Sequence, residues 1–372
     1  MEIVHLILGK ANPERMNGVN KVVHQLATKQ TENGQNVSVW GITKDLEENF
    51  GTRNFKTRLF KKSRNPFAIP TLLKKAIEAS ATDTVFHLHG GWIPVFFSLS
   101  LFLKKNNRKM VITAHGSYNQ IAMNKNKTLK KWYYRFFEKK VLFSAETIHC
   151  IGQSEEEGLQ NFHSTKKSVL VPYGFEMQPA ENLNITQNQE IIFGFIGRLD
   201  IFTKGLDTLL EAFAKTTKEI PKAQLWIVGE GNQKNTLVEL ISELALEKNV
   251  FLLGGKFGKE KEEILQKIDV FVHPSRNEGL PASVLEAASF GKPCIITDAT
   301  NLGNEIRKYN CGMSISSQNS RELAQTMWKM HQIWKNQPEF LIIRKNAIKM
   351  VFEAFNWKKV LSELNRYVYQ SA

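Results

Sequence analysis

The chain has 372 residues, of which 42% are apolar, so it is long enough for about two domains with hydrophobic cores. Its net charge is +14, and residues 1–180 hold 26 Lys+Arg against 14 Asp+Glu, a surplus of +12. Three cysteines without a CxxC pair argue against a disulfide framework or a zinc site and predict a reducing, cytoplasmic location.

Two further classes of protein are disfavoured. The most apolar stretch, residues 92–103, is too short to span a bilayer, and polar residues interrupt the first apolar run, so neither a membrane span nor a signal peptide is expected. The basic first half indicates an acidic partner. Because the chain carries no nucleic-acid-binding motif, we expect an anionic membrane surface and no nucleic acid.

Short apolar runs alternate with amphipathic periods through the first half of the chain. Gly18 follows the first expected strand and opens a helix that Asn17 would cap and Gly34 would end. Residues 44–65 are polar and basic and are predicted to be a loop. The strands are expected at 3–8, 37–42, 84–88, 110–113, 147–151 and 168–171, and the helices at 18–33 and 70–79.

Residues 125–143 predict a basic, aromatic amphipathic helix, the composition of a helix that lies in a membrane interface. The apolar stripe would hold Leu129, Trp132, Tyr133, Phe136 and Phe137, and the basic face Lys131, Arg135 and Lys139. The alternative is an ordinary packed helix with its aromatic side chains in the core, and the sequence leaves both open.

The second half repeats the alternation of strands and helices, which predicts parallel sheets with helices on both faces. The expected strands are 191–196, 224–228, 250–253, 268–272 and 294–297, and the expected helices begin near 204, 237, 260, 281, 319, 338 and 357. Residues 176–189 are polar without an apolar period and predict a linker. We therefore expect an α/β protein with domains at 1–178 and 190–352, followed by a C-terminal segment, 353–372.

Residues 269–293 form the most informative stretch. An apolar run passes into a polar loop, Pro281 sits where a helix begins, and Gly291 and Pro293 mark its end. A strand, a loop and a helix N-terminus form the usual ligand corner of an open parallel sheet and suit a phosphate. Glu278 and Glu286 flank this turn and could accept hydrogen bonds from sugar and ribose hydroxyls. The alternative is a solvated loop glutamate and a surface helix glutamate.

Arg198 and Lys204 also lie between a strand and a helix. A guanidinium can grip pyrophosphate oxygens bidentately, and an ammonium adds a point charge. Taken alone, each could equally be a surface base.

The whole string PSRNEGLPASVLEAASFGKP resembles the signature of retaining family 4 glycosyltransferases, which have the GT-B fold. The matching residues are Glu278, Gly279, Leu280, Pro281, Glu286, Gly291 and Pro293. The resemblance implies two Rossmann-like domains whose parallel sheets face each other across a cleft. The first would bind the acceptor, the second would bind the nucleotide-sugar, and the C-terminal helix would cross back to the first.

The resemblance also implies roles in donor binding. Arg198 and Lys204 would neutralise the leaving diphosphate, Glu286 would hold the ribose, and Glu278 would hold sugar hydroxyls beside Gly279, Leu280 and Pro281. Three further residues have weaker matches: Gly18 would face the donor phosphates, Gly229 lies in a family turn, and Lys256 lies in a loop that contacts the nucleotide base.

Histidines follow two expected strands. Histidine at such a position is more often structural than catalytic. In the family, a histidine after the strand 110–113 contacts the transferred sugar, and His115 is the match here. His89 would help to bind the acceptor.

The implied activity is a metal-independent, retaining hexosyltransferase that needs no cofactor. It would move a sugar from a nucleotide-diphosphate sugar to a glycan or lipid-linked glycan in surface polysaccharide or lipopolysaccharide assembly. Peripheral attachment at the inner face of the cytoplasmic membrane, through Lys131, Trp132, Arg135, Phe136 and Lys139, is an open possibility. The rival functions are a GT-B nucleotide-sugar epimerase and a non-catalytic sugar-binding or membrane-adaptor protein.

Overall fold

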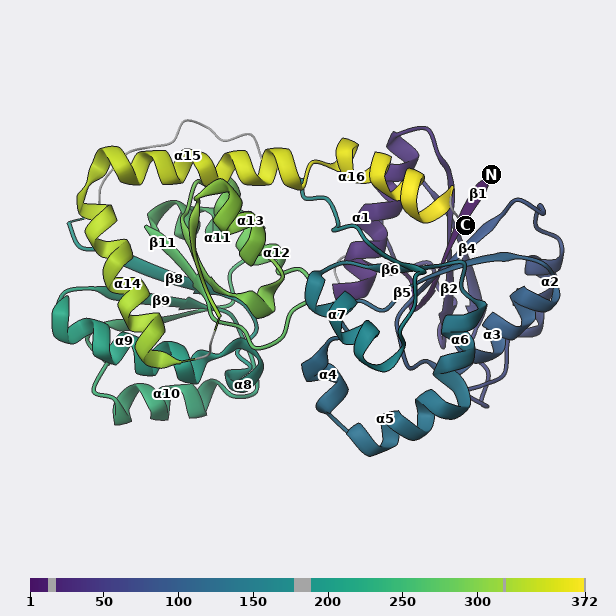
Figure 1. The fold of residues 1–372 in the computed structure, drawn as a ribbon, viewed down its shortest axis with the longest axis horizontal. Helices are drawn as coiled ribbons and strands as arrows, with labels where there is room; N and C mark the ends of the chain where they lie inside the picture. The colour runs from purple at the N-terminus through teal and green to yellow at the C-terminus, as the bar shows by residue number, and fades with distance from the viewer. Residues whose placement is uncertain (13–17, 177–188, 317–318, 371–372) are drawn as a thin grey trace. The chain divides into compact units, whose positions relative to one another are not determined.

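The computed structural model describes residues 1–12, 18–176, 189–316 and 319–370, and the chain divides into two compact α/β units (Figure 1). Unit 1 comprises Met1–Gly174 and Trp357–Ala372, and unit 2 comprises Phe175–Asn356. The predicted cap Asn17 and most of the predicted linker, residues 177–188, lie outside the described residues. The prediction of two α/β domains built on parallel sheets is confirmed.

Unit 1 is built on a seven-stranded sheet in which all the pairings are parallel, in the order β3-β2-β1-β4-β5-β6-β7. Its strands are β1 (Glu2–Leu8), β2 (Asn36–Thr43), β3 (Lys56–Lys61), β4 (Val85–His89), β5 (Lys109–Thr113), β6 (Thr147–Cys150) and β7 (Ser168–Leu170). The central strands are buried along almost their whole length, because helices cover both faces of a parallel sheet.

Amphipathic periods in the sequence predicted some, but not all, of the helices of unit 1. They are α1 (Gly18–Glu32), α2 (Thr71–Glu78), α3 (Pro94–Lys105), α4 (Gln120–Asn124), α5 (Lys127–Tyr133), α6 (Lys139–Ser144), α7 (Gln153–Phe162) and α16 (Trp357–Glu363), with π-helical segments at Tyr134–Glu138 and Leu364–Tyr369. Helices α2, α3, α6 and α7 contribute side chains to one core with the sheet. Helices α1 and α16 contact each other, and Figure 1 shows them side by side.

Two predictions for unit 1 are wrong. Residues 44–65 are not all loop, since β3 pairs with β2 at the sheet edge. Its charged side chains are exposed, as is usual for an edge strand. Because these charges interrupt the apolar residues, the sequence contains no apolar run here that would predict a strand. Residues 125–143 do not form one regular helix, because the π-helical segment Tyr134–Glu138 separates α5 from α6.

Unit 2 is built on a six-stranded parallel sheet in the order β10-β9-β8-β11-β12-β13. Its strands are β8 (Ile192–Ile196), β9 (Gln224–Val228), β10 (Val250–Gly254), β11 (Val270–His273), β12 (Cys294–Thr297) and β13 (Gly312–Ile315). The short edge strand β13 was not predicted, because only four residues form it and the first of them is a glycine.

Helices cover both faces of the second sheet in two layers (Figure 1). They are α8 (Ile201–Lys204), α9 (Leu206–Glu219), α10 (Lys234–Glu243), α11 (Gly258–Lys267), α12 (Ala282–Ser289), α13 (Gly303–Tyr309), α14 (Ser320–Lys335) and α15 (Gln337–Ala354). No helix was predicted where α13 lies. Pro281 is the residue immediately before α12 and has the extended backbone of a cap. In the described part of the chain, no helix is both long and apolar enough to cross a membrane.

Candidate functional site

Glu278 lies at the carboxyl end of β11, in the loop that leads to α12. His273, the last residue of β11, donates a hydrogen bond from Nε2 to Glu278 Oε1 over 2.9 Å. The imidazole is buried and stacked on the rings of Phe195 and Phe271, at centroid distances of 5.4 and 6.1 Å. Two aromatic rings therefore fix the histidine, and the histidine fixes the carboxylate.

Lys204 brings a positive charge to the same carboxylate. Its ammonium forms an ion pair with Glu278 Oε1, and the two side chains are only 16% and 13% exposed. Burial favours a higher pKa for Glu278, but the hydrogen bond and charge of His273, together with Lys204, outweigh it and lower the pKa to about 2. Glu278 is thus an anion at any physiological pH.

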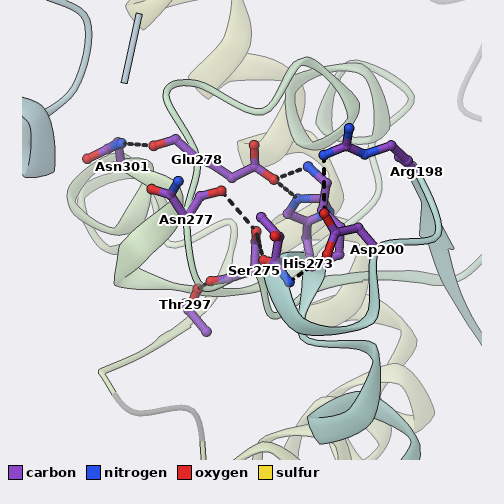
Figure 2. A network of polar contacts seen from close by, with 10 residues as sticks. Arg198, Asp200, His273, Ser275, Asn277, Glu278, Thr297 and Asn301 are labelled. Carbon is purple, nitrogen blue, oxygen red and sulfur yellow. Dashed lines mark hydrogen bonds and ion pairs between the residues drawn. The ribbon is translucent and has the colours of Figure 1, made fainter. Parts of the chain in front are cut away.

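The loop around Glu278 is held by several neighbouring side chains. Asn301 donates from Nδ2 to the carbonyl oxygens of Glu278 and Gly279, over 2.9 and 2.7 Å. Arg276 forms a bidentate pair with Asp207, at 2.7 and 2.9 Å. Figure 2 shows Asn301 and Thr297 beside the loop, to which Ser275 belongs, while the Glu278 side chain points toward His273. The position of the carboxylate is therefore set by at least three separate segments of unit 2.

Gly205 explains how Lys204 can lie so close to the loop. The residue has a left-handed backbone, with φ +68°, and a Cβ there would overlap the carbonyl oxygen of Pro274. Only glycine allows this close approach of the α8–α9 junction to the residue that follows β11.

Arg198 lies beside this cluster but is not part of its ion pairs. Its side chain is 62% exposed, and its guanidinium donates to Asp200 over 3.2 Å. Figure 2 shows both residues next to the His273–Glu278 pair. Asp200 also caps α8 by accepting from the backbone N–H of Thr203 at 3.0 Å. The exposed guanidinium is open to an anion from solvent.

The other donor-site candidates of unit 2 have separate partners. Glu286 on α12 pairs with Lys261 on α11 at 2.6 Å, and Lys256 pairs with Glu260 at 3.0 Å. Gly229 has φ +152°, and a Cβ there would overlap the carbonyl oxygen of Gly197, so this glycine is required by the close approach of the β8 and β9 ends. Leu280 packs, partly buried, against the core formed with α12.

The candidates of unit 1 lie at the ends of its strands and at the start of α1. Gly18 is exposed, and a Cβ there would contact no described atom within 4 Å, so the fold itself does not require glycine. His115 follows β5 with a left-handed backbone, φ +54°, which is uncommon for a residue other than glycine and often marks a functional position. His89, at the end of β4, is buried and hydrogen-bonded to His115 at 2.9 Å.

One group of described residues is close enough to share a metal ion. His5, His87 and His89 place ring nitrogens within 4.8 Å of one another. Both ring nitrogens of each histidine already have a hydrogen-bond partner, so a metal ion would have to displace those bonds.

Several residues that build the site were not predicted from the sequence. His273 directly follows the predicted strand 268–272, and His115 likewise lies just after a predicted strand, so this position was an available signal. Asn301 and Lys261 gave no signal, because each is joined to the loop or to α12 only by the packing of separate elements.

In chemical terms, unit 2 offers a fixed carboxylate, a lysine beside it and an exposed guanidinium. Sugar hydroxyls can donate to the carboxylate, and phosphate oxygens can bind the two bases. The first turn of α12 directs backbone N–H groups toward its N-terminal end, close to the same loop.

Comparisons with known proteins agree with this chemistry. The family model for glycosyl transferases group 1 matches residues 180–350, and that for glycosyltransferase family 4 matches residues 16–178. An uncharacterized glycosyltransferase of Methanocaldococcus jannaschii is 31% identical over 271 residues, which cover 66% of this chain and 64% of the relative.

Two further relatives have more informative names. The Escherichia coli UDP-Gal:alpha-D-GlcNAc-diphosphoundecaprenol alpha-1,3-galactosyltransferase is 28% identical over 210 residues, 51% of each chain. The structure of Anabaena Alr3699/HepE in complex with UDP superposes on the whole of both chains with a TM-score of 0.72 at 14% identity. At that identity the likeness concerns the fold.

Proposed function

The chain belongs to the family 4 glycosyltransferases, whose C-terminal part is described as glycosyl transferases group 1, and on this basis we propose that it is a retaining glycosyltransferase. It transfers a sugar from a nucleotide-diphosphate sugar to a hydroxyl of a glycan or lipid-linked glycan. The bond between the anomeric carbon and the diphosphate oxygen breaks, a bond to the acceptor oxygen forms, and the acceptor hydroxyl releases its proton.

The observation that carries this proposal is the buried Glu278 anion paired with Lys204, with the guanidinium of Arg198 left open beside it. In the proposed mechanism, Arg198 and Lys204 stabilise the charge that develops on the leaving diphosphate. Glu278 accepts hydrogen bonds from hydroxyls of the transferred sugar and orients its anomeric carbon. Because Glu278 also holds Lys204, diphosphate binding and sugar orientation are coupled.

The remaining donor contacts follow the family resemblance. Glu286 holds the ribose, Lys256 lies beside the base, and Gly18 leaves room for phosphates at the start of α1. His115 contacts the transferred sugar, and His89 supports acceptor binding. The UDP bound to the Anabaena structure supports a nucleotide donor for a protein of this fold. The reaction as proposed requires neither a metal ion nor a cofactor.

We propose a membrane-associated acceptor. The name of the E. coli relative describes a sugar carried on diphosphoundecaprenol, which supports a lipid-linked glycan in surface polysaccharide assembly. An acceptor of this kind is presented at a bilayer, so the enzyme would work as a peripheral protein at the cytoplasmic face. The three cysteines are free and buried, which fits a reducing compartment.

The surface of the α5–α6 segment supports membrane contact. Leu129, Trp132 and Phe136 are 68%, 60% and 48% exposed, although a packed helix would bury them. The rings of Trp132 and Phe136 stack at 5.7 Å. Lys131, Arg135 and Lys139 are exposed on the same segment, so apolar and basic groups face solvent together. This combination suits the interface of an anionic bilayer.

The donor proposal is tested with a thermal-shift panel of UDP-, GDP- and ADP-sugars. A ligand at 100 times its Kd stabilises the folded state by about 2.7 kcal/mol, or roughly 5–10 °C in Tm for a domain of this size. We expect one nucleotide class to give the shift and Arg198→Ala to lose it. Arg321→Ala, which removes an exposed arginine from α14, is the matched control. No shift with any donor sugar would contradict the proposal, and conversion of the sugar without an acceptor would indicate an epimerase.

The membrane proposal is tested by sedimentation with vesicles that contain phosphatidylglycerol. Each basic residue near an anionic surface contributes about 1 kcal/mol, so the triple variant K131E/R135E/K139E is expected to weaken binding by at least 100-fold. The control is K329E/K335E/K345E, which reverses three exposed lysines on α14 and α15. Equal vesicle binding by the two triple variants would rule out this surface.

A further inference from the structure

The strand register of unit 1 places four histidines and a threonine on one face of the sheet. His5 on β1 is paired with His87 on β4, and Thr113 on β5 is paired with both His89 and His149. Side chains of paired residues on neighbouring parallel strands point to the same face. All five side chains are buried. A row of polar groups therefore crosses the interior of unit 1, where each needs a hydrogen-bond partner.

The row is hydrogen-bonded from end to end, and its first acceptor is fixed. His149 Nε2 lies 2.7 Å from the carbonyl oxygen of Val171, which can only accept, so Nε2 carries the proton. The Nδ1 of a neutral His149 must then accept from the Thr113 hydroxyl at 2.8 Å. That hydroxyl has one proton, so it accepts from His87 Nε2 at 2.6 Å.

The order of donors and acceptors continues through the C-terminal segment. With its proton on Nε2, His87 accepts at Nδ1 from the Tyr369 hydroxyl over 3.0 Å. The tyrosine oxygen in turn accepts from Gln30 Nε2 at 3.3 Å, which turns the amide oxygen Oε1 toward His5 Nε2 at 2.7 Å. The orientation of the Gln30 amide is therefore determined by Tyr369.

The last links reach His115. His5 donates from Nε2 to Gln30, so its Nδ1 accepts from His89 Nε2 at 2.8 Å. His89 Nδ1 then accepts from His115 Nε2 at 2.9 Å. No described residue is a hydrogen-bond partner of His115 Nδ1. His115 is partly exposed, whereas the other residues of the hydrogen-bond chain are buried. The hydrogen-bond chain thus ends on the Nδ1 lone pair of a partly exposed histidine.

Each step of this order depends on neutral imidazoles, and their surroundings keep them neutral. Burial lowers the pKa of His5 and of His149 to about 4, and that of His115 to about 3. Burial, together with the neighbouring histidines, holds the pKa values of His87 and His89 well below their usual range. A neutral histidine has one donor and one acceptor, so a single proton order runs through the chain.

We propose that this hydrogen-bond chain, from Val171 O to His115, fixes His115 as the Nε2–H tautomer and presents its Nδ1 as an acceptor for a sugar hydroxyl. Tyr369 and Gln30 are accordingly positioning residues, although neither touches His115. The identification of a sugar hydroxyl as the donor to His115 Nδ1 rests on the proposed transferase function, whereas the tautomer of His115 does not. Stacking of Tyr173 on the His115 ring, at 5.7 Å and 20°, holds the imidazole plane in place.

Removal of the Tyr369 hydroxyl tests the longest hydrogen bond of the hydrogen-bond chain, that of Gln30 with Tyr369 at 3.3 Å. In Tyr369→Phe, the Gln30 amide loses its acceptor and is free to rotate, and its NH₂ group can then donate to His5. This rotation reverses the proton order in His5, His89 and His115. In protein labelled with ¹⁵N-histidine, and with His115→Gln for assignment, we expect wild-type His115 to show an unprotonated Nδ1. In Tyr369→Phe, this signal should move toward the protonated position.

Tyr134→Phe is the matched control. It also removes a tyrosine hydroxyl bonded to a histidine Nδ1, that of His163 at 3.0 Å, but outside the chain. Only the His163 signals are expected to change. A wild-type His115 protonated on Nδ1, or an unchanged His115 spectrum in Tyr369→Phe, would overturn the proposal.

A second pair of variants guards against misfolding and links the tautomer to function. Thr113→Val removes the hydroxyl with little change in shape, and Thr113→Ser keeps it. We expect the valine variant alone to shift the His115 tautomer and to lower kcat/KM for transfer roughly tenfold, the cost of about one hydrogen bond. A tautomer shift without any measurable transfer by the wild type would contradict the proposed function and leave the hydrogen-bond chain standing. Equal spectra for the two variants would contradict the chain.

Discussion

At the residue scale, Glu278 combines a largely buried side chain with a negative charge at physiological pH. The carboxylate accepts from His273 and Lys204, and these two partners offset the cost of burial. A buried charge with its partners removed is expensive, so each member of this trio depends on the others. The same trio provides the proposed sugar and diphosphate contacts, which means that donor binding and local stability are linked.

We predict that the stabilising effect of Glu278 depends on pH. Its pKa falls from 4.5 to about 2 on folding, so its contribution of about 3 kcal/mol is present above pH 4.5 and is lost between pH 4.5 and 2. Urea unfolding of wild type and Glu278→Gln should show the larger difference at pH 7.5 and a smaller one at pH 3.5. In the background of Lys204→Met the difference should shrink at pH 7.5. A difference that does not vary with pH would show that the carboxylate is not held by these charges.

At the element scale, the ends of the strands in unit 2 are close-packed at glycines. Gly205 brings the α8–α9 junction against Pro274, and Gly229 brings the end of β9 against Gly197. These contacts place Lys204 and Arg198 next to the loop that carries Glu278. Short elements separated by glycine therefore position the charged side chains more tightly than long flexible loops would.

We predict that Gly205→Ala destabilises unit 2 far more than backbone strain alone requires. Gly34→Ala is the matched control, because Gly34 has a similar φ of +78° but open space around a Cβ. The control should cost about 1–2 kcal/mol in the free energy of unfolding, the strain of a left-handed alanine. Gly205→Ala should cost at least about 2 kcal/mol more, because its Cβ overlaps a carbonyl oxygen. Equal losses in urea unfolding would mean that the α8–α9 junction can move away from Pro274.

At the scale of the whole molecule, the two units have separate cores and different electrostatic interiors. Unit 1 holds five connected neutral histidines, four of them buried, whereas unit 2 holds the largely buried, charged Glu278 trio. The C-terminal residues of the chain belong to unit 1 and supply Tyr369 to the histidine row. The stability of unit 1 therefore depends on both ends of the sequence.

We predict that acid unfolds unit 1 before unit 2. The five histidines stay neutral in the folded state down to about pH 4 but are protonated below about pH 6.5 when unfolded, so their stabilising effect is lost as the pH falls through this range. Burial raises the pKa of Glu155 to about 7 in the folded state, so Glu155 releases about one proton on unfolding near pH 5. This release offsets part of the proton uptake by the histidines. Unfolding of unit 1 near pH 5 should then take up about four protons.

Pulse proteolysis in urea, with the peptides of each unit identified by mass spectrometry, measures the urea midpoint of unfolding of each unit at pH 7.5, 6.0 and 5.0. The urea midpoint of unit 1 should fall steeply with pH, while that of unit 2 should change little over the same range. Parallel midpoints for the two units would contradict the neutral-histidine interior.

The sequence by itself determined the class of fold and the family. Apolar runs of four to seven residues and amphipathic periods are local patterns, so most strands and helices followed from them. The motif around Glu278 and Glu286 is also local, and its string of matching residues was enough to identify the family. The charged edge strand β3 and the short strand β13 were not predicted, because they hold too few apolar residues to form a pattern.

Only the tertiary structure decided which side chains meet. The hydrogen bond between Gln30 and Tyr369 joins residues that are 339 apart in the sequence. This bond and those of His5 and His87 depend on strand order and register, which no local pattern encodes. The ion pair of Lys204 with Glu278 depends in the same way on the packing of α8 against the loop after β11. The exposure of Trp132 and Phe136 was likewise undecided by periodicity, because a helical stripe states which residues share a face and not what covers that face.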